Sequence, residues 1–254
     1  MAHSTPASAR LIAGNWKMNG GAGQLREAAK VAAALAGKIG GPRVAICPPA
    51  TLLHRLSEQL RGSGVLTGGQ DCHVEAAGAF TGDISADLLV EAGARLAILG
   101  HSERRQGHSE SDALVARKAQ AASDVGLEPI VCVGETLIER EGGRALEVVR
   151  RQLRGSLPPG LAGRAFAIAY EPVWAIGTGA RASEDDIVEM HRAIRAELMN
   201  LTSHGGRVSI LYGGSVTADG AAAILAAPEV GGVLVGGASL RAESFLAIIE
   251  AAER

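Results

Sequence analysis

The chain has 254 residues, of which 47% are hydrophobic and only 3% are aromatic, and its formal net charge is -2. This size suits one complete eight-unit α/β barrel, although two smaller domains would fit on length alone. The weak charge and the lack of long blocks of like charge argue against an extended surface for nucleic acid or acidic membranes, so a small anionic ligand would need a local site.

Residues 1–10 are polar and contain no apolar core of a signal peptide, and no run of about 18 apolar residues occurs in the sequence. We therefore expect a cytoplasmic protein in which residues 1–10 form a flexible N-terminal extension. Cys47, Cys72 and Cys132 are odd in number and unclustered, which is typical of free thiols in a reducing compartment. No Cys or His pair has the spacing of metal ligands, so we expect no metal.

Eight short apolar runs, each followed by a helix-like segment, divide the chain into strand-then-helix units without a break in composition. Buried strands that alternate with amphipathic helices indicate a parallel sheet covered by helices. Eight units favour a single-domain (β/α)8 TIM barrel over residues 1–254, although an open doubly wound sheet would give a similar pattern. The runs are residues 11–13, 44–47, 65–66, 96–99, 130–133, 166–170, 208–211 and 233–235.

Two helices are predicted by their apolar stripes. In residues 183–199, Ser183 is placed to cap the N-terminus, and acidic residues follow in the first turn. In the second helix, Gly155 and Pro158 act as stop signals. The stripes consist of Ile187, Met190, Ile194 and Leu198 in the first helix, and of Leu146, Val149 and Leu153 in the second.

Polar residues follow five of the eight predicted strands, which is where barrel enzymes carry their functional groups. This placement favours the closed barrel over the open sheet. The five strand ends are residues 15–19, 100–104, 171, 212–215 and 236–239.

The sixth strand end has the pattern of a catalytic carboxylate followed by a lid. Glu171 ends the strand, and the following proline holds it in an extended conformation. An apolar tip, too short for a helix and too exposed for core, leads into a glycine-rich hinge, which is typical of a lid that excludes water. A strand with an ordinary surface loop is the alternative. The lid residues are Pro172, Val173, Trp174, Ala175, Ile176, Gly177 and Thr178.

The first and fourth strand ends supply further candidates. Lys17 lies among apolar neighbours, where a cation can hold an anionic substrate, and strand periodicity puts Asn15 on the same face. His101 opens a predicted helix, whose dipole favours the neutral imidazole as a hydrogen-bond donor. The alternatives are that Lys17 is an ordinary solvated lysine and that His101 is structural. For Glu103 with its neighbours Arg104 and Arg105, the alternative is a solvated charged cluster. We expect this last interpretation to hold for Arg105 at least.

Glycine pairs follow the seventh and eighth strands, at Gly213-Gly214 and at Gly236-Gly237. Backbone N–H groups without a Cβ nearby can surround a phosphate, and barrels commonly carry their phosphate site at these two strand ends. Glycine pairs alone are more often ordinary turns. Two pairs at successive strand ends, together with Gly177, predict a phosphate site that also includes Ser215.

From Gly14 onward, these motifs resemble the triosephosphate isomerase family. The stretch around Glu171 is similar to the base and lid of that family, and residues 100–105 match its histidine signature. The resemblance implies a cofactor-independent aldose-ketose isomerase that interconverts dihydroxyacetone phosphate and D-glyceraldehyde 3-phosphate through an enediolate, in glycolysis and gluconeogenesis. The glycine motifs do not follow the fingerprint of dinucleotide-binding proteins, which agrees with the expectation of no cofactor.

The resemblance also implies roles for single residues. Glu171 is the base, His101 the electrophile or acid, and Glu103 a partner of Lys17, while Ser102 assists and Tyr212 anchors the closed lid. Asn15 and Lys17 are active-site groups that bind the substrate, and the phosphate is held by Gly177, Ser215, Gly236 and Gly237.

The long segment of residues 70–83 implies a homodimer. In the family this loop inserts into the neighbouring subunit, which brings Thr81 to the partner's site. Asp83 stands where the family pattern leads us to expect Glu, and residues 1–10 have no counterpart in the family core. We expect no nucleic-acid or membrane partner.

Two other functions fit parts of the sequence. A different phosphate-binding barrel, such as a sugar-phosphate epimerase, would keep the glycine pairs but lack the combination of Asn15, Lys17, His101 and Glu171. A non-catalytic scaffold protein would have lost the base or the electrophile, and neither is lost here.

Overall fold

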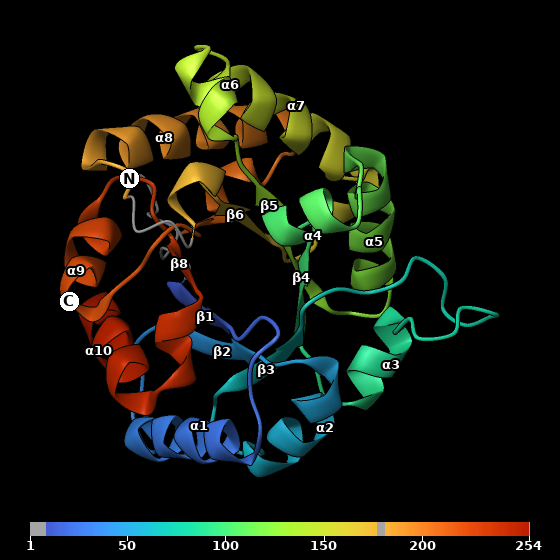
Figure 1. The fold of residues 1–254 in the computed structure, drawn as a ribbon, viewed down its shortest axis with the longest axis vertical. Helices are drawn as coiled ribbons and strands as arrows, with labels where there is room; N and C mark the ends of the chain where they lie inside the picture. Colours follow the sequence, from blue (N-terminus) through green and yellow to red (C-terminus); the bar gives the residue numbers. More distant parts are fainter. Residues whose placement is uncertain (1–8, 177–180, 254) are drawn as a thin grey trace, which may run out of the picture.

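The computed structural model describes residues 9–176 and 181–253, and its eight parallel strands close into a barrel (Figure 1). Each strand pairs with its neighbours in sequence, and β8 pairs with β1 through Leu11 and Gly232. The (β/α)8 barrel is thus confirmed, and the open sheet is wrong. The strands are β1 (Leu11–Asn15), β2 (Arg43–Cys47), β3 (Leu66–Gly69), β4 (Leu96–Leu99), β5 (Glu128–Val133), β6 (Ala167–Tyr170), β7 (Ser209–Tyr212) and β8 (Gly232–Val235).

Helices surround the strands on the outside (Figure 1). No helix in the described part of the chain is both long and apolar enough to cross a membrane. The helices are α1 (Ala22–Leu35), α2 (Ala50–Gln59), α3 (Ala86–Glu91), α4 (Ser102–Gly107), α5 (Asp112–Asp124), α6 (Leu137–Glu141), α7 (Ala145–Ser156), α8 (Glu184–Leu201), α9 (Ala218–Ala226) and α10 (Ala242–Ala252), with 3-10 turns η1 (Pro159–Leu161), η2 (Val173–Ala175), η3 (Gly205–Arg207) and η4 (Gly237–Leu240).

Helix α8 forms for the reasons that its sequence indicates. The Ser183 side chain accepts a hydrogen bond from the Asp186 N–H, and the Asp186 side chain accepts one from the Ser183 N–H. This reciprocal cap satisfies two donors that a helix start leaves free. All four predicted apolar residues of its stripe are buried against the barrel, so the predicted stripe is confirmed.

The core has two layers, because alternate residues of each strand face opposite sides. Ala13 and Ala169 belong to the cluster inside the barrel, whereas Ile12 and Ile168 pack outward under the helices. The inward row of β1 continues from Ala13 to Asn15, and that of β6 continues from Ala169 to Glu171. Both polar side chains are therefore carried to the mouth of the barrel by the strand pattern.

The third strand lies further along the chain than expected. The apolar pattern predicts residues 65–66, whereas β3 runs from Leu66 to Gly69. Its glycines allow close packing: a Cβ on Gly68 would lie 2.2 Å from Leu96 Cδ1, and one on Gly69 would lie 2.6 Å from Leu89 Cδ1. A search for apolar side chains misses such a strand.

Arg10 ties the start of the barrel to its last two helices. Its guanidinium donates hydrogen bonds to the carbonyl of Ala252 in α10 and to that of Leu225 in α9, both at 3.1 Å. The expected N-terminal extension therefore does not include Arg10. Residues 1–8 lie outside the described part of the structure.

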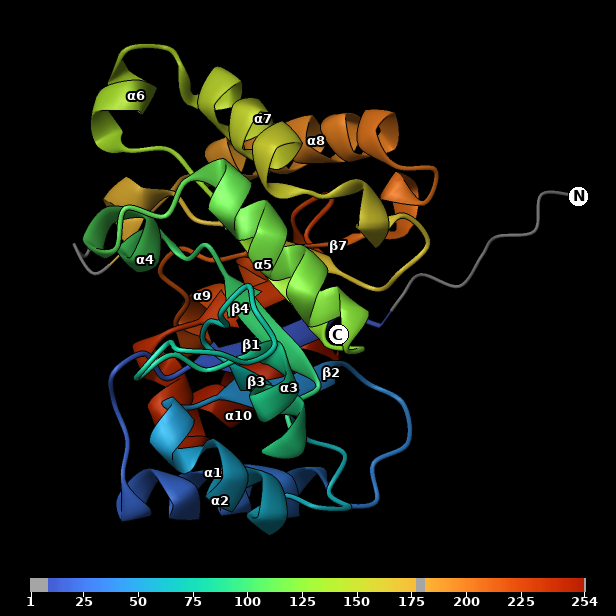
Figure 2. The ribbon, with the colours of Figure 1, turned by 90° about the vertical axis from the view of Figure 1, so that its right-hand side faces the viewer.

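The segment between β3 and α3 reaches outward beyond the ring of helices (Figure 1). Seen from the side, α4 and α6 lie at the same end of the barrel (Figure 2). Helix α4 follows β4, and α6 follows β5. This end is therefore the mouth at which the strand ends collect.

Candidate active site

Glu171 is the centre of the mouth. Its N–H donates to the Val133 carbonyl at 2.8 Å, which extends the pairing of β6 with β5 by one residue. The side chain is almost fully buried, and its Oε2 accepts a hydrogen bond from the Ser102 N–H at 2.8 Å. Its Oε1 lies 2.7 Å from His101 Nε2. The predicted base is thus held by groups of two neighbouring strand ends.

His101 is the N-cap residue of α4, and its ring is oriented by that helix. Its Nδ1 accepts a hydrogen bond from the Glu103 N–H at 3.2 Å, so a neutral ring carries its proton on Nε2, facing Glu171. Burial acts to lower the pKa of His101, but the charge and hydrogen bond of the Glu171 carboxylate outweigh it and leave the pKa raised. The expected neutral imidazole stays a prediction.

Lys17 adopts a left-handed backbone conformation, with φ of 51°. Its N–H donates to Asn15 Oδ1 at 3.0 Å, and its carbonyl accepts from Gln70 Nε2 at 2.9 Å. Its Nζ lies 2.6 Å from Glu103 Oε1. Lys17 therefore leaves the strand, and the expectation that periodicity puts it on the face of Asn15 is wrong; the Asn15 side chain instead caps the turn.

The glycines after β8 leave open space beside Lys17. A Cβ on Gly236 would lie 3.7 Å from Lys17 Cε, an ordinary contact, and one on Gly237 would meet nothing within 4 Å. Packing within the protein therefore does not require glycine at either position. The Gly236 carbonyl accepts from both the N–H and the hydroxyl of Ser239, which fixes the turn.

The glycines after β7 serve a different purpose. A Cβ on Gly214 would lie 2.2 Å from the Tyr212 hydroxyl oxygen, and one on Gly213 would lie 3.0 Å from Glu171 Cγ. Both positions need glycine because neighbouring side chains approach closely. The Ser215 hydroxyl donates to the Ala175 carbonyl at 2.7 Å, so this turn holds the described part of the lid. Burial raises the pKa of Tyr212 to about 12, against a hydrogen bond from the Ala182 backbone that lowers it.

The first half of the lid is more ordered than its sequence suggests. Residues Val173–Ala175 form the 3-10 turn η2, and Ala175 is fully buried, which corrects the expectation of an exposed tip. Trp174 Nε1 donates to Glu135 Oε1 at 2.9 Å. Of the predicted lid residues, Gly177 and Thr178 lie outside the described part of the chain, and so does the predicted phosphate contact of Gly177.

Glu135 was not predicted as part of the site. It is fully buried and binds three side chains of the lid region: besides Trp174, its carboxylate accepts from the Tyr170 hydroxyl at 3.1 Å and from Arg140 Nη1 at 3.2 Å. The available signal was its place two residues after β5, where a carboxylate at the end of the fifth strand follows the same rule as Glu171.

Arg105 is a structural residue of the barrel, so its assignment to a solvated cluster is wrong. Only 14% of its side chain is exposed. It donates to the carbonyls of Gly100 at 2.8 Å and Cys132 at 3.1 Å, and it pairs with Asp112 at 2.6 Å. It joins the ends of β4 and β5.

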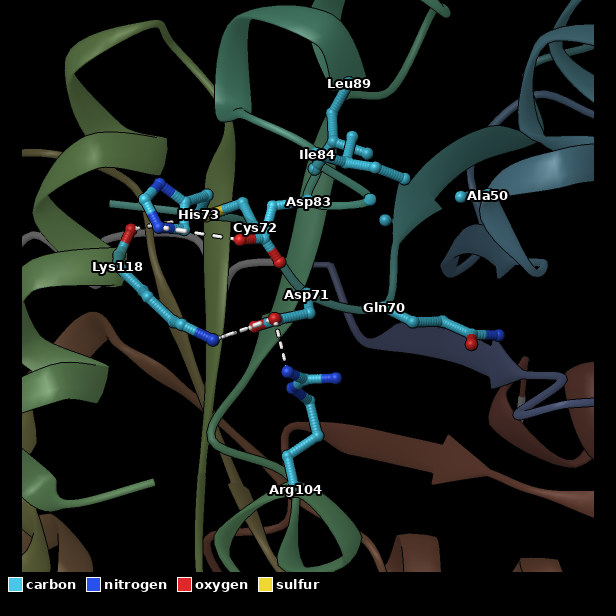
Figure 3. A pocket seen from close by; sticks show the side chains of 12 residues that line it. Ala50, Gln70, Asp71, Cys72, His73, Asp83, Ile84, Leu89, Arg104 and Lys118 are labelled. Atoms are coloured by element: carbon cyan, nitrogen blue, oxygen red, sulfur yellow. Dashed lines mark hydrogen bonds and ion pairs between the residues drawn. The ribbon is translucent and has the colours of Figure 1, made fainter. Parts of the chain in front are cut away.

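Arg104 belongs to a charge network at the base of the β3–α3 segment. It pairs with Asp71 at 2.9 Å and with Glu110 at 2.7 Å, and Lys118 lies 2.8 Å from the same Asp71 carboxylate. Figure 3 shows Asp71 between Arg104 and Lys118, with Gln70 pointing away from this cluster. The solvated interpretation is wrong for Arg104 as well.

The β3–α3 segment is internally ordered although it projects from the barrel. The His73 and Phe80 rings lie 4.1 Å apart, and the His73 N–H donates to the Ile84 carbonyl at 2.7 Å. Thr81 and Asp83 are exposed, and so is 42% of Phe80. At the end of the first strand, Met18 is 95% exposed.

Comparison with known proteins gives one consistent result. The sequence model of the triosephosphate isomerase family matches residues 10–252. A protein of Caulobacter vibrioides named triosephosphate isomerase is 63% identical over 242 residues, covering 95% of this chain and 96% of the relative. One from Acidiphilium cryptum with the same name is 55% identical, with coverage of 96% and 99%. The crystal structure of triosephosphate isomerase from Bartonella henselae superposes with a TM-score of 0.89 at 45% identity, covering 96% of this chain and 99% of that one.

Proposed function

The chain belongs to the triosephosphate isomerase family, and we propose that Glu171 is the base of the reaction at the mouth of its barrel. The enzyme is an aldose-ketose isomerase that interconverts dihydroxyacetone phosphate and D-glyceraldehyde 3-phosphate, a step of glycolysis. Its substrate is a triose phosphate. The assignments of individual residues below are proposals.

The reaction moves one proton between neighbouring carbons of the substrate. The Glu171 carboxylate takes a proton from the carbon beside the carbonyl, and the electron pair of that C–H bond moves to the carbonyl oxygen to give an enediolate. His101 Nε2–H and the Lys17 ammonium stabilise the negative oxygen. Glu171 then returns the proton to the neighbouring carbon. The second proton, which moves between the two oxygens, passes through His101.

The position of the base is the observation that carries this proposal. Glu171 is buried at the mouth, its Oε2 is held by a backbone N–H, and its Oε1 faces His101 Nε2. Carboxylate and imidazole are thus in direct contact at the mouth, where a substrate carbonyl would take over the imidazole N–H. Asn15 supports the same site because it holds the turn from which Lys17 projects.

The phosphate site is proposed beside Lys17. Backbone N–H groups at Gly236 and Gly237 border open space, and the nearby ammonium neutralises part of the phosphate charge. We assign Ser215 and Gly177 to this grip as well. Ser215 lies on the lid-holding turn, so its hydroxyl would exchange its bond with Ala175 when the lid closes. Glu103, which pairs with Lys17, orients the ammonium.

The test is a coupled assay of the purified protein with D-glyceraldehyde 3-phosphate, which follows the formation of dihydroxyacetone phosphate. We expect fast turnover that Glu171→Ala reduces by orders of magnitude while the fold is kept. Unchanged turnover in this variant would contradict the assignment of the base. A folded protein without turnover would favour another phosphate-binding barrel or a scaffold role, and phosphate binding would distinguish those two.

We also propose that the chain is one domain and assembles as a homodimer. One barrel accommodates all of the described residues, which supports the single domain over 1–254. The projecting β3–α3 segment supports a dimer in which Thr81 approaches the partner's Asn15 and Lys17. The three free, buried cysteines support a cytoplasmic location.

A further inference from the structure

We infer that Gln152, in the outer helix α7, is a positioning residue for the base and for the first part of the lid. This inference rests on the proposed role of Glu171. It starts from Gly134, the residue after the end of β5, whose N–H donates to Gln152 Oε1 at 2.7 Å and whose carbonyl accepts from Gln152 Nε2 at 3.0 Å.

These two hydrogen bonds take the place of pairing between Gly134 and a neighbouring strand. Strand β4 pairs with β5 only as far as Leu99 and Val131, because the chain then turns into α4. Beyond that point, the β5 groups that face β4 need other partners, since unpaired backbone groups are costly. Arg105 takes the Cys132 carbonyl, and the Gln152 amide, which offers both a donor and an acceptor, takes both groups of Gly134.

The opposite side of the same segment holds the site. The Val133 carbonyl accepts the N–H of Glu171 at 2.8 Å, and the Glu135 carbonyl accepts the N–H of Val173 at 3.1 Å. Residues 133 and 135 thus face β6, while Gly134 between them faces Gln152. The base and the first residue of η2 are therefore bonded to a segment whose other edge is held at Gly134 by the Gln152 side chain.

Direct packing strengthens the coupling between Gly134 and the base. A Cβ on Gly134 would lie 1.7 Å from the Glu171 carbonyl oxygen and 2.6 Å from its carbonyl carbon. The two backbones are thus in close contact, and a movement of Gly134 is passed to Glu171. A catalytic group displaced by about 1 Å can cost on the order of 100-fold in rate.

The first test compares Gln152→Met with Gln59→Met. Methionine has a similar length but bonds neither group of Gly134. Gln59 is the matched control, because its Nε2 donates to the Leu25 carbonyl at 2.8 Å between α2 and α1, away from the mouth. We expect Gln152→Met to lower kcat by about 10- to 100-fold with KM within about twofold, and to raise the share of turnovers that release inorganic phosphate. The control should keep kcat and phosphate release at the wild-type level.

The second variant, Gln152→Glu, keeps an acceptor for the Gly134 N–H but brings a carboxylate against the Gly134 carbonyl. Protonation of the introduced carboxyl restores a donor. The ratio of its kcat to that of the wild type should therefore rise as the pH falls. This variant also provides the answer if Gln152→Met does not fold.

The inference is overturned if kcat of Gln152→Met equals that of Gln59→Met, or if only the unfolding midpoint changes. A kcat ratio for Gln152→Glu that does not change with pH would also overturn it. Glu171→Ala, measured alongside, distinguishes a failure of the proposed base from a failure of the positioning role of Gln152. Full activity of Glu171→Ala would contradict the assignment of Glu171 as the base. An inactive Glu171→Ala together with a fully active Gln152→Met would contradict only the positioning role of Gln152.

Discussion

Glu171 Oε1 and His101 Nε2 lie 2.7 Å apart, and both side chains are almost closed to solvent. The proposed base and the proposed acid are therefore in direct contact. A substrate carbonyl that takes the Nε2–H of His101 would free the carboxylate to attack the neighbouring C–H bond. Substrate entry would thus replace the contact between the two side chains by a hydrogen bond from His101 to the substrate.

Removing the carboxylate charge should lower the pKa of His101. Burial alone acts to lower it, and Glu171 is the largest influence in the opposite direction. In Glu171→Gln we therefore expect the His101 pKa to fall below its wild-type value, so that the imidazole stays neutral to lower pH. NMR titration of the ring measures this. An equal or higher pKa in the variant would mean that another group sets the charge state of His101.

A side chain at Gly237 should impair phosphate binding without disturbing the fold. A Cβ there meets no protein atom within 4 Å, so Gly237→Ala and Gly237→Val should unfold at the wild-type temperature. We expect affinity for inorganic phosphate to drop by about tenfold, more for valine, because the added groups occupy the space in front of the backbone N–H groups. Calorimetric titration gives the affinity. Unchanged phosphate binding in the valine variant would place the grip elsewhere.

His191 should make the fold less stable in acid. It is fully buried in α8, its Nδ1 lies 3.3 Å from the Glu229 carbonyl, and its ring meets Tyr170 edge-on. Burial lowers its pKa to about 4, against 6.5 for a free imidazole, and the nearby positive charge of Arg195 acts in the same direction.

Between these two pH values the unfolded chain binds a proton that the folded chain does not. The stability is therefore complete above pH 6.5 and falls as the pH is lowered towards 4, by roughly 3 kcal/mol. Urea unfolding of the wild type and of His191→Gln at several pH values tests this. The variant should lose less stability over that range. Parallel curves for the two proteins would contradict it.

Dimer formation should depend on the β3–α3 segment. Phe80 is half-exposed on the His73 ring near the tip of this segment. If the proposed dimer forms, we expect Phe80→Asp to shift it towards monomers in sedimentation velocity and to lower activity at low protein concentration, because a charge at the tip would be desolvated in the interface. Leu88→Asp on the exposed face of α3 serves as a comparison for a general charge effect. A wild-type protein that sediments as a monomer would end the dimer proposal.

Residues at strand ends could be predicted from the sequence because each follows a recognisable apolar run. Asn15, His101 and Glu171 are reached by counting along their own strands, and the barrel brings those ends together. Lys17 could be predicted in the same way, but its left-handed backbone could not, because Gln70, which donates to the Lys17 carbonyl, is 53 residues away in the chain.

The supporting residues could not be predicted, since their partners are backbone groups or side chains on other units of the barrel. Gln152 is an ordinary polar residue of an amphipathic helix, and Gly134 lies 18 residues before it. The charged run around Arg105 indicates a solvated side chain, yet its guanidinium donates hydrogen bonds to carbonyls at two strand ends. The extent of strand β3 could not be predicted from apolar side chains, because it ends in two glycines.

Proton exchange in deuterated water tests the central claim most directly. If Glu171 removes the proton from carbon and returns it, product formed by the wild type should carry deuterium at the reacting carbon, because the carboxyl proton exchanges with solvent during part of the turnovers. We expect Glu171→Ala to incorporate deuterium at least about a thousandfold more slowly than the wild type, while it still binds inorganic phosphate. Deuterium incorporation at the wild-type rate in Glu171→Ala would contradict it.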